Sequence, residues 1–315
     1  MKRNLTGLVA GLAAAAVIAF SPAAQAEYPE GPVSFVVPFP PGDLEDVLTR
    51  LIADEFQEMY DVPAAVVNKP GGGGGPFPGA AEVAAAPADG SMIGSFVIAV
   101  PVVGPVVGVP GMEEGTFDPV GIFLTYPFVI AAGKDAPYST MKELAAHAKE
   151  NPVALGHFGG PLVPTRVARA VAKKEGFDYG SDAAFDELTC NTLASGDVDV
   201  MTTTIQQILA CLDDVNILLT VTEAPISSVP DAPVLAEDYP DLALSLWNGL
   251  FVKAGTPDDV KEKITAAAVA ALKSEEAKKV AEATGAIIYW DDPEKSAERI
   301  KKDQETFRTI GSMLQ

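Results

Sequence analysis

The sequence predicts an α/β protein built from two lobes. Short apolar, β-branched runs alternate with amphipathic segments, glycine-rich loops separate them, and this alternation occurs twice along the chain. The chain has 315 residues, which is more than one hydrophobic core usually supports. Two cores, and therefore two lobes, are the natural expectation.

The segment 1–26 has the features of a secretory signal peptide. Met1-Lys2-Arg3 is a short basic start, an apolar stretch follows from Leu8 to Phe20, and Ala24-Gln25-Ala26 supplies small residues for cleavage. We therefore expect a mature chain that starts at Glu27, is periplasmic, and does not insert into the membrane after cleavage. A retained N-terminal anchor is the alternative.

The composition excludes several classes of partner. The formal net charge is −21, which argues against nucleic acid and against anionic membrane surfaces, because both attract Lys and Arg. It does not exclude an anionic ligand, since local donors outweigh distant, screened charges.

The two cysteines, Cys190 and Cys211, leave two possibilities open: one disulfide, or two buried thiols. No cofactor is implied. Metal binding is not expected, because the chain has no C-x-x-C motif and only two histidines.

The periodicity predicts an ordered series of elements in both lobes, with a mainly parallel sheet. Strands are expected at 33–37, 64–67, 92–97, 128–132, 153–156, 198–202 and 217–221. Helices are expected at 46–56, 80–86, 141–149, 167–174, 257–272, 277–283 and 293–310.

The final helices have no strands of their own in this prediction, so we expect them to return and cover the first lobe. The first lobe is then 27–126, the second 127–246, and the return segment 247–315. Two crossings between lobes make a hinge that allows closure around a ligand.

The loop Pro38 to Asp46 lies at the carboxyl end of a strand and at the start of a helix. Ligands bind at such positions in open α/β sheets, and helix-start N–H groups attract anions. Asp46 is the expected N-cap. A plain turn, which also favours Pro and Gly, is the alternative.

A second loop begins with Asn68-Lys69-Pro70 and continues with five glycines, Gly71 to Gly75. Glycine lets the backbone approach a ligand closely and can present consecutive N–H donors. No G-K-[ST] follows and the dinucleotide fingerprint is incomplete, so neither nucleotide motif applies. A flexible linker is the alternative.

The matching loop of the second lobe runs from Gly156 to Arg166. Thr165 can donate a hydroxyl hydrogen bond, and Arg166 can form a bidentate bond with a carboxylate. A solvated helix residue is an equal alternative for Arg166. His157 is expected to be a polar loop residue rather than a catalyst.

Catalytic patterns are missing from the sequence. It has no G-x-S-x-G elbow and no H-E-x-x-H, and neither cysteine lies in a nucleophile motif. Asp43 and Glu45 could form a pair of carboxylates, but nothing supplies the rest of a mechanism. We therefore expect no enzyme activity.

At these loops the chain resembles the Bug family, the TctC-type substrate-binding proteins of tripartite tricarboxylate transporters. The resemblance covers essentially the whole mature chain. It is carried by these segments in order: Tyr28-Pro29, Val36-Val37-Pro38-Phe39, Pro41-Gly42, Asn68-Lys69-Pro70-Gly71, Pro87-Ala88-Asp89-Gly90, Phe117-Asp118-Pro119-Val120, Leu193-Ala194-Ser195-Gly196-Asp197-Val198-Asp199, Val229-Pro230-Asp231-Ala232-Pro233 and Ala254-Gly255-Thr256-Pro257.

The resemblance implies a two-lobed periplasmic binding protein of type II, or "Venus flytrap", with a hinge. It implies capture of a carboxylated metabolite for membrane permease subunits. With the loops above, it leads us to expect ligand contacts at Phe39, Pro41, Gly42, Asp43, Gly71, Gly72, Gly73, Gly74, Phe158, Thr165, Arg166 and Thr203. The alternatives are a sensory or interaction protein and a periplasmic hydrolase.

The chain departs from the family pattern in both lobes. A single Gly42 precedes Asp43-Leu44-Glu45 where the family has a run of glycines, and Thr165-Arg166 replaces a Ser-His pair. A tyrosine-lysine-glycine stretch is also absent near Phe185. The change at Asp43-Leu44-Glu45 removes small residues and adds negative charge beside the expected pocket. Besides a small organic acid, the ligand could therefore be an amino acid or other zwitterion, whose ammonium would meet Asp43 or Glu45, or a smaller polar solute.

Overall fold

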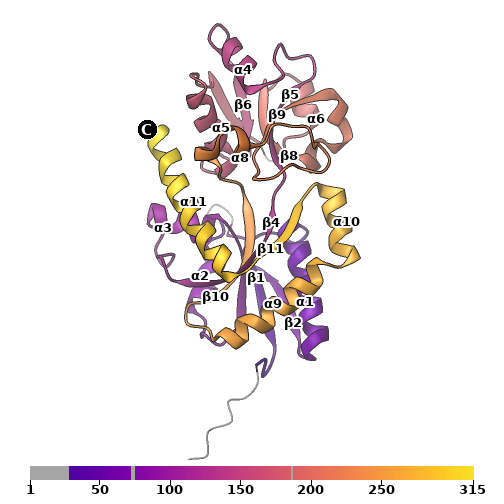
Figure 1. The fold of residues 1–315 in the computed structure, drawn as a ribbon, viewed down its shortest axis with the longest axis vertical. Coiled ribbons are helices and arrows are strands. Elements are labelled where there is room, and N and C mark those ends of the chain that lie inside the picture. Colours follow the sequence, from indigo (N-terminus) through magenta and orange to yellow (C-terminus); the bar gives the residue numbers. More distant parts are fainter. Residues whose placement is uncertain (1–27, 72–74, 186) are drawn as a thin grey trace, which may run out of the picture.

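The computed structural model describes residues 28–71, 75–185 and 187–315, and it forms two lobes with one β-sheet each (Figure 1). The two-lobed α/β fold predicted from the sequence is confirmed. The predicted signal peptide, 1–26, lies outside the described residues.

The six-stranded sheet of the first lobe has the order β11-β4-β10-β3-β1-β2. Its strands are β1 (Val33–Val37), β2 (Ala64–Asn68), β3 (Met92–Val97), β4 (Phe117–Thr125), β10 (Trp247–Lys253) and β11 (Ile287–Asp291). The associated helices are α1 (Leu44–Tyr60), α2 (Phe77–Ala85), η2 (Ala99–Val103), α3 (Gly104–Val107), α9 (Asp258–Leu272), α10 (Glu275–Thr284) and α11 (Pro293–Met313).

The five-stranded sheet of the second lobe has the order β7-β6-β8-β5-β9. Its strands are β5 (Phe128–Gly133), β6 (Ala154–His157), β7 (Ser181–Ala184), β8 (Val200–Thr204) and β9 (Val215–Thr220). The helical segments are α4 (Met141–Ala148), α5 (Val163–Lys174), α6 (Cys190–Ala194), α7 (Ile205–Ile208), η3 (Leu209–Asp214), α8 (Leu235–Asp238) and η4 (Pro240–Leu242).

Two expectations about the strands were wrong. The sheets are mixed rather than mainly parallel, because β10 runs antiparallel to β3 and β4, and β5 runs antiparallel to β8 and β9. The return segment also contributes strands, since β10 lies inside the first sheet and β11 at its edge. Gly121 of β4 fits this edge because a Cβ there would lie 2.2 Å from the Trp290 ring of β11.

The strand directions decide which loops meet. β1, β2 and β3 are parallel, and β4 runs with them because both β3 and β4 are antiparallel to β10. In the other sheet, β8 and β9 oppose β5, and β6 runs with β8. Since β4 passes directly into β5, the carboxyl ends of β1, β2 and β3 face those of β6, β8 and β9.

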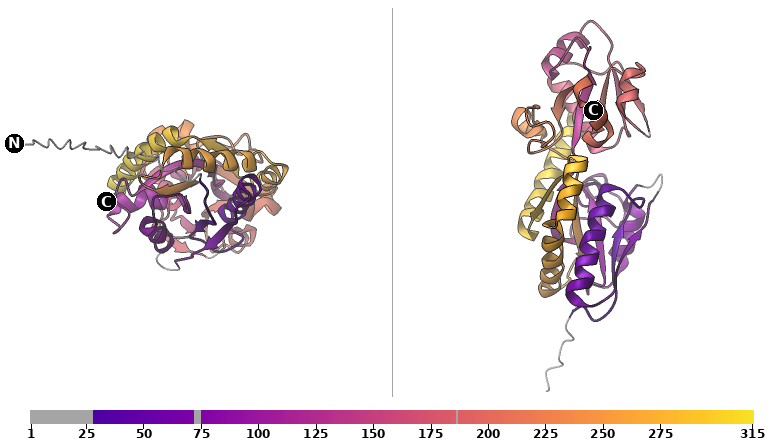
Figure 2. Two further views of the ribbon diagram at one scale, coloured as in Figure 1. Left: turned by 90° about the horizontal axis from the view of Figure 1, so that it is seen from below. Right: turned by 90° about the vertical axis from the view of Figure 1, so that its right-hand side faces the viewer.

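The two chain crossings lie side by side. Tyr126, between β4 and β5, donates its backbone N–H to the carbonyl of Leu246, immediately before β10, at 2.8 Å. The last helix is a third link, because α11 packs against β4 and η2 of the first lobe and against α5 of the second. Figures 1 and 2 show this helix extending from the first lobe to the second.

Cys190 and Cys211 form a disulfide that joins α6 to η3, with their Cα atoms 6.0 Å apart. The sequence left a disulfide and two free thiols open, and the structure selects the disulfide. It ties together two short helical segments of the second lobe.

Candidate functional site

Buried polar side chains gather where the two sheets face each other. β4, β6 and β9 end on Thr125, His157 and Thr220, and all three side chains are buried. Burying a polar group is costly unless it is hydrogen-bonded. Their shared position at the strand ends makes this edge a polar region of the molecule.

The loop after β1 is held by a carboxylate. Asp46 accepts a hydrogen bond from the backbone N–H of Gly42 at 2.8 Å, from the Asn68 amide at 2.7 Å, and from Arg50 at 2.9 Å. Asn68 also donates to the carbonyl of Phe39 at 3.1 Å. Desolvation opposes ionisation of Asp46, but these hydrogen bonds lower its pKa.

Asp46 is not the N-cap that the sequence predicted. The helix starts one turn earlier, at Leu44, with Asp43 in the N-cap position, and Asp46 is the third helical residue. From there its side chain reaches back to Gly42, whose φ of 93° is readily adopted only by glycine. The Gly42 N–H is therefore used inside the loop, while Pro41 and Asp43 are exposed and Phe39 is half-buried.

The two described glycines that flank the gap in the second loop of the first lobe, Gly71 and Gly75, lie close together. A Cβ on Gly71 would lie 2.1 Å from the carbonyl oxygen of Gly75, so only glycine fits there. Gly72, Gly73 and Gly74 lie outside the described residues. Asn68, at the end of β2, connects the start of this loop to the loop after β1.

Glu45 is placed away from the exposed side of the loop. Its side chain is only 3% exposed, and the hydroxyl of Tyr126, at the crossing between lobes, donates to it at 2.6 Å. Burial raises the pKa of Glu45 to about 7, although the Tyr126 hydrogen bond opposes this shift. Glu45 therefore couples α1 to the crossing, and Asp43 is the only acid of the pair on the exposed side.

Three predicted residues belong to the facing edge of the second lobe. Phe158 is half-buried and its ring meets that of Phe128 at 6.1 Å between centroids. Thr165 is buried at the start of α5 and donates to the carbonyl of Gly159 at 2.9 Å. Thr203 is buried near the end of β8 and donates to the carbonyl of Leu188 at 2.7 Å. Both hydroxyls shape the lobe's own backbone.

Arg166 lies apart from these residues. Its guanidinium carbon is 4.9 Å from the centroid of the Phe307 ring on α11, and the side chain lines a cavity outside the facing edge. His157 is not the loop residue that the sequence predicted: it is the last residue of β6, it is buried, and its Nε2 lies 3.1 Å from Asp182.

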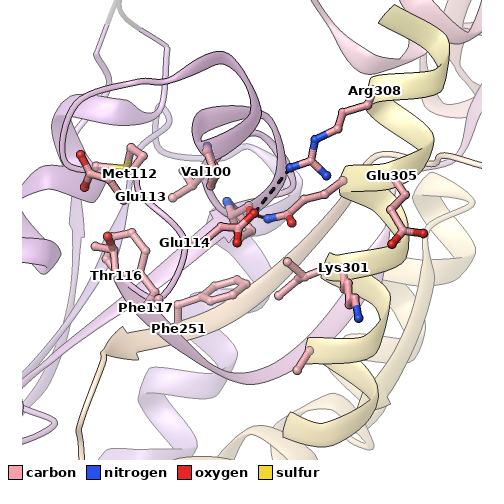
Figure 3. A pocket seen from close by; sticks show the side chains of 16 residues that line it. Val100, Met112, Glu113, Glu114, Thr116, Phe117, Phe251, Lys301, Glu305 and Arg308 are labelled. Carbon is pink, nitrogen blue, oxygen red and sulfur yellow. Dashed lines mark hydrogen bonds and ion pairs between the residues drawn. The ribbon is translucent and has the colours of Figure 1, made fainter.

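Two hollows in the surface contain almost none of the predicted residues. One, of about 370 Å³, lies between α11 and the segment around α3, with Phe117 and Phe251 at its floor and Glu114 paired with Arg308 at its rim (Figure 3). The other, of about 470 Å³, is the cavity beside Arg166. Neither lies between the facing loops.

Sequence reasoning missed three residues of this edge: Asn68, Arg50 and Tyr126. Asn68 could have been found, because it ends a predicted strand and begins the glycine loop. Arg50 could have been suspected from its i, i+4 spacing to Asp46. Tyr126 gave no local signal, since only the fold brings it to Glu45.

Two lobes joined by adjacent crossings, with loops at strand ends facing each other, define a periplasmic solute-binding protein fold. Residues 48–312 match the tripartite tricarboxylate transporter family receptor, TctC. The chain belongs to this family, which consists of solute-binding proteins, so the resemblance noted in the sequence is confirmed. Within the described residues, no helix could span a membrane and no cluster of metal-ligating side chains occurs.

Two relatives are similar over most of their length. A UPF0065 protein encoded between tcbD and tcbE in Pseudomonas sp. strain P51 is 28% identical and is aligned over 90% of this chain and 86% of its own. A UPF0065 protein from the ttuE-ttuC' intergenic region of Agrobacterium vitis is 30% identical over 84% of this chain and 78% of its own.

Solved structures share the fold. A TctC solute-binding protein from Polaromonas, without ligand, has a TM-score of 0.78 at 23% identity, covering 91% of this chain and 99% of its own. MatC from Rhodopseudomonas palustris with bound malate has a TM-score of 0.70 at 22% identity, covering 90% and 99%. Another R. palustris protein, with adipate, has a TM-score of 0.72 at 20% identity, covering 91% and 98%.

Proposed function

We propose that this protein captures a small carboxylate or zwitterion between its lobes in the periplasm and delivers it to a tripartite tricarboxylate-type permease. The proposal includes export through the signal peptide at 1–26 and binding without chemical change. The observation that carries it is the set of strand-end loops from two sheets that face each other across a pair of adjacent crossings. Relatives of this fold that hold malate and adipate support the class of ligand.

In this proposal the lobes are 27–126 with 247–315, and 127–246, and they close about the crossings. The ligand carboxylate would meet backbone N–H groups at the loop Gly71 to Gly74 and at the first turn of α5, where helical N–H groups have no partner within the helix. Phe39, Pro41 and Phe158 would cover the ligand's carbon chain. Thr165 and Thr203 would hold the second lobe's backbone in place for it.

Asp43 would select among ligands. It is exposed at the N-cap of α1, whereas Glu45 is buried against Tyr126 and Asp46 is used by the loop. A single carboxylate beside the pocket favours a ligand that carries an ammonium or only one negative charge, because like charges repel.

Replacing Asp43 with Gly should therefore shift the ligand preference towards dianions. We expect the affinity for a dicarboxylate to rise by about tenfold relative to the affinity for an amino acid, which corresponds to roughly 1.4 kcal/mol of binding free energy. Isothermal titration with both ligands measures the ratio. An unchanged ratio would place Asp43 outside the pocket, and Asp54→Gly, on the exposed side of α1, is the matched control.

The test of the proposed function is a stability screen of the mature protein with malate, adipate, other organic acids and amino acids. A ligand at about 100 times its dissociation constant should stabilise the protein by about 2.7 kcal/mol. The bound compound should be recovered unchanged, which separates binding from hydrolysis. A complete absence of stabilising compounds would contradict the proposal.

A further inference from the structure

Arg299 of α11 lies where the two lobes are joined, beside both chain crossings. Its guanidinium carbon is 5.7 Å from the centroid of the ring of Trp247, the first residue of β10. One terminal nitrogen donates to the hydroxyl of Tyr289 in β11 at 2.6 Å. That hydroxyl is hydrogen-bonded at 3.0 Å to Thr125, the last residue of β4. Within the first lobe, Arg299 is therefore fixed against both strands that connect to the second.

The other terminal nitrogen of Arg299 reaches the second lobe. It donates to the Glu223 carboxylate at 2.7 Å and to the Ser245 hydroxyl oxygen at 3.0 Å. Glu223 follows β9, and Ser245 lies just before the crossing into β10. The Ser245 hydroxyl in turn donates to the Glu223 carboxylate, whose two oxygens lie 2.8 and 2.7 Å from it. One guanidinium thus binds groups that belong to both lobes.

The ion pair between Arg299 and Glu223 is partly shielded from water. The Arg299 side chain is 16% exposed and that of Glu223 is 33% exposed. Asp291 and Asp303 also lie near the guanidinium, at 3.8 and 3.7 Å. Burial opposes the charge of Arg299, but the neighbouring negative charges, with Glu223 first, raise its pKa above the ordinary value. Arg299 therefore stays charged, and its hydrogen bonds to Glu223 are stronger than those of an exposed pair.

A second contact ties α11 to the second lobe further along the helix. The ring of Phe307 lies 4.9 Å from the guanidinium carbon of Arg166, which is on α5. Phe307 is about 12 Å beyond Arg299 along the axis of α11, at 1.5 Å per residue. Two adjacent crossings by themselves act as a hinge. Attachments at two different distances from the crossings resist rotation about that hinge.

We infer that Arg299 is a positioning residue, which holds the two lobes at one relative orientation by binding Glu223 and Ser245 of the second lobe from α11 of the first. Without this link, the lobes would sample a wider range of orientations about the crossings. This holding role needs no ligand, and only its effect on affinity rests on the proposed function. Arg299 would then set the fraction of molecules whose lobes are already arranged for the ligand, and this fraction scales the apparent dissociation constant.

Double electron–electron resonance between spin labels in the two lobes tests this role in the ligand-free mature protein. Labels at Glu58→Cys on α1 and Lys142→Cys on α4 take exposed positions, one in each lobe. The native cysteines form a disulfide and leave no other thiol for the label. We expect Arg299→Gln and Glu223→Ala to broaden the distribution of distances between the labels. Arg299→Lys, which keeps the charge but loses the parallel donors, should give an intermediate width.

Arg308→Gln is the matched control, because Arg308 lies on the same helix but pairs at 3.5 Å with Glu114 of its own lobe. It should leave the distribution unchanged. Circular dichroism checks that each variant is folded. Where Arg299→Gln does not fold, Glu223→Ala decides alone, because it removes the second-lobe partner and strands no buried charge. Distributions as narrow as that of the wild type, in every folded variant of Arg299 and Glu223, would overturn the inference.

Isothermal titration with a ligand found in the stability screen measures the effect on binding. We expect the dissociation constants of Arg299→Gln and Glu223→Ala to differ from that of the wild type by about fivefold or more. A broadened distribution with unchanged affinity would overturn the effect on binding. A screen without any hit would contradict the proposed function but leave the distance measurement unaffected, so the two proposals fail separately.

Discussion

The loop after β1 in the first lobe and the loop after β6 in the second occupy matching positions, yet different interactions hold them. Charge holds the first: Asp46 gathers Gly42, Asn68 and Arg50 around one carboxylate. A neutral hydroxyl holds the second, where Thr165 bonds to Gly159. The second lobe adds a covalent link, between Cys190 and Cys211. A carboxylate therefore holds the loop in one lobe and a hydroxyl holds it in the other, while the disulfide joins two other segments of the second lobe.

We expect the largest loss of stability from removal of the disulfide between Cys190 and Cys211. The disulfide joins residues 21 apart in sequence, and a loop of that length corresponds to about 3–4 kcal/mol of lost chain entropy in the unfolded state. Replacing both cysteines with serine should lower the free energy of unfolding by that amount. Denaturation of the wild type with and without reductant is the measurement. Indifference to reductant would show that the second lobe does not depend on this link.

The second largest loss of stability should come from the loop after β1, which the Asp46 carboxylate holds. Asp46→Ala removes the acceptor for three residues, Gly42, Asn68 and Arg50, and we expect a loss of about 2–3 kcal/mol in the free energy of unfolding. Arg50→Ala should cost less than about 1 kcal/mol, because the Arg50 side chain is 44% exposed while that of Asp46 is 2% exposed. Urea denaturation of both variants provides the comparison. Equal losses would mean that the ion pair with Arg50, rather than the hydrogen bonds that Asp46 accepts from Gly42 and Asn68, holds the loop.

The crossing between the lobes, unlike the two loops, should make the stability of the protein depend on pH, because Glu45 is buried there against Tyr126. The folded state raises the pKa of Glu45 to about 7, so it holds a proton that the unfolded chain releases nearer its ordinary pKa of about 4.3. The free energy of unfolding should therefore fall as the pH rises between these two values. Between about pH 5.5 and 7.5 we expect a loss of about 2 kcal/mol.

Glu45→Gln should flatten this pH profile, because the amide is neutral at every pH and still accepts the Tyr126 hydroxyl. Burial also raises the pKa of Asp303 to about 6, although Arg299 opposes that shift. In the Glu45→Gln variant, the free energy of unfolding should thus still fall with rising pH below about pH 6, because of Asp303. Denaturant titrations across the pH range measure both parts. A profile that Glu45→Gln leaves unchanged would remove Glu45 from this role.

We expect the smallest loss of stability from the loop after β6, which the Thr165 hydroxyl holds. Thr165→Val keeps the shape of the side chain but removes its hydrogen bond to Gly159, and we expect a loss of about 1 kcal/mol. Thr165→Ser, which keeps the hydroxyl, is the control. If the valine variant were as stable as the serine variant, packing alone would hold the second loop.

The parts of the fold that the sequence predicts well are those with continuous apolar runs. β1 and β3 have the predicted bounds because most of their residues are apolar, with only Ser34 in β1 and Gly94 and Ser95 in β3 as small exceptions. β4 and β10 were missed because Pro119, Asn248 and Gly249 interrupt their patterns. In the core, the Asn248 amide nitrogen donates to Ser95 at 2.8 Å, a partner that lies far away in the sequence.

The candidate site likewise has one part that the sequence predicts and another that it does not. The positions of its loops follow from local alternation, because a loop after a parallel strand must emerge at the carboxyl edge of the sheet. The direction of a side chain on those loops does not follow, as Glu45 and Arg166 show. Glu45 turns to Tyr126, and Arg166 turns to Phe307, through contacts between residues that are 81 and 141 positions apart.

The amino-acid sequence alone determined the two-lobed α/β class, the family, the order of the main elements and the loops at the strand ends, because hydrophobic period and turn chemistry are local properties. Tertiary structure alone decided the strand order, the disulfide, and which charged groups face solvent, a cavity or the hinge. Those outcomes depend on free energies of burial and pairing between distant residues, and a charge is costly or favourable only according to what the fold places beside it.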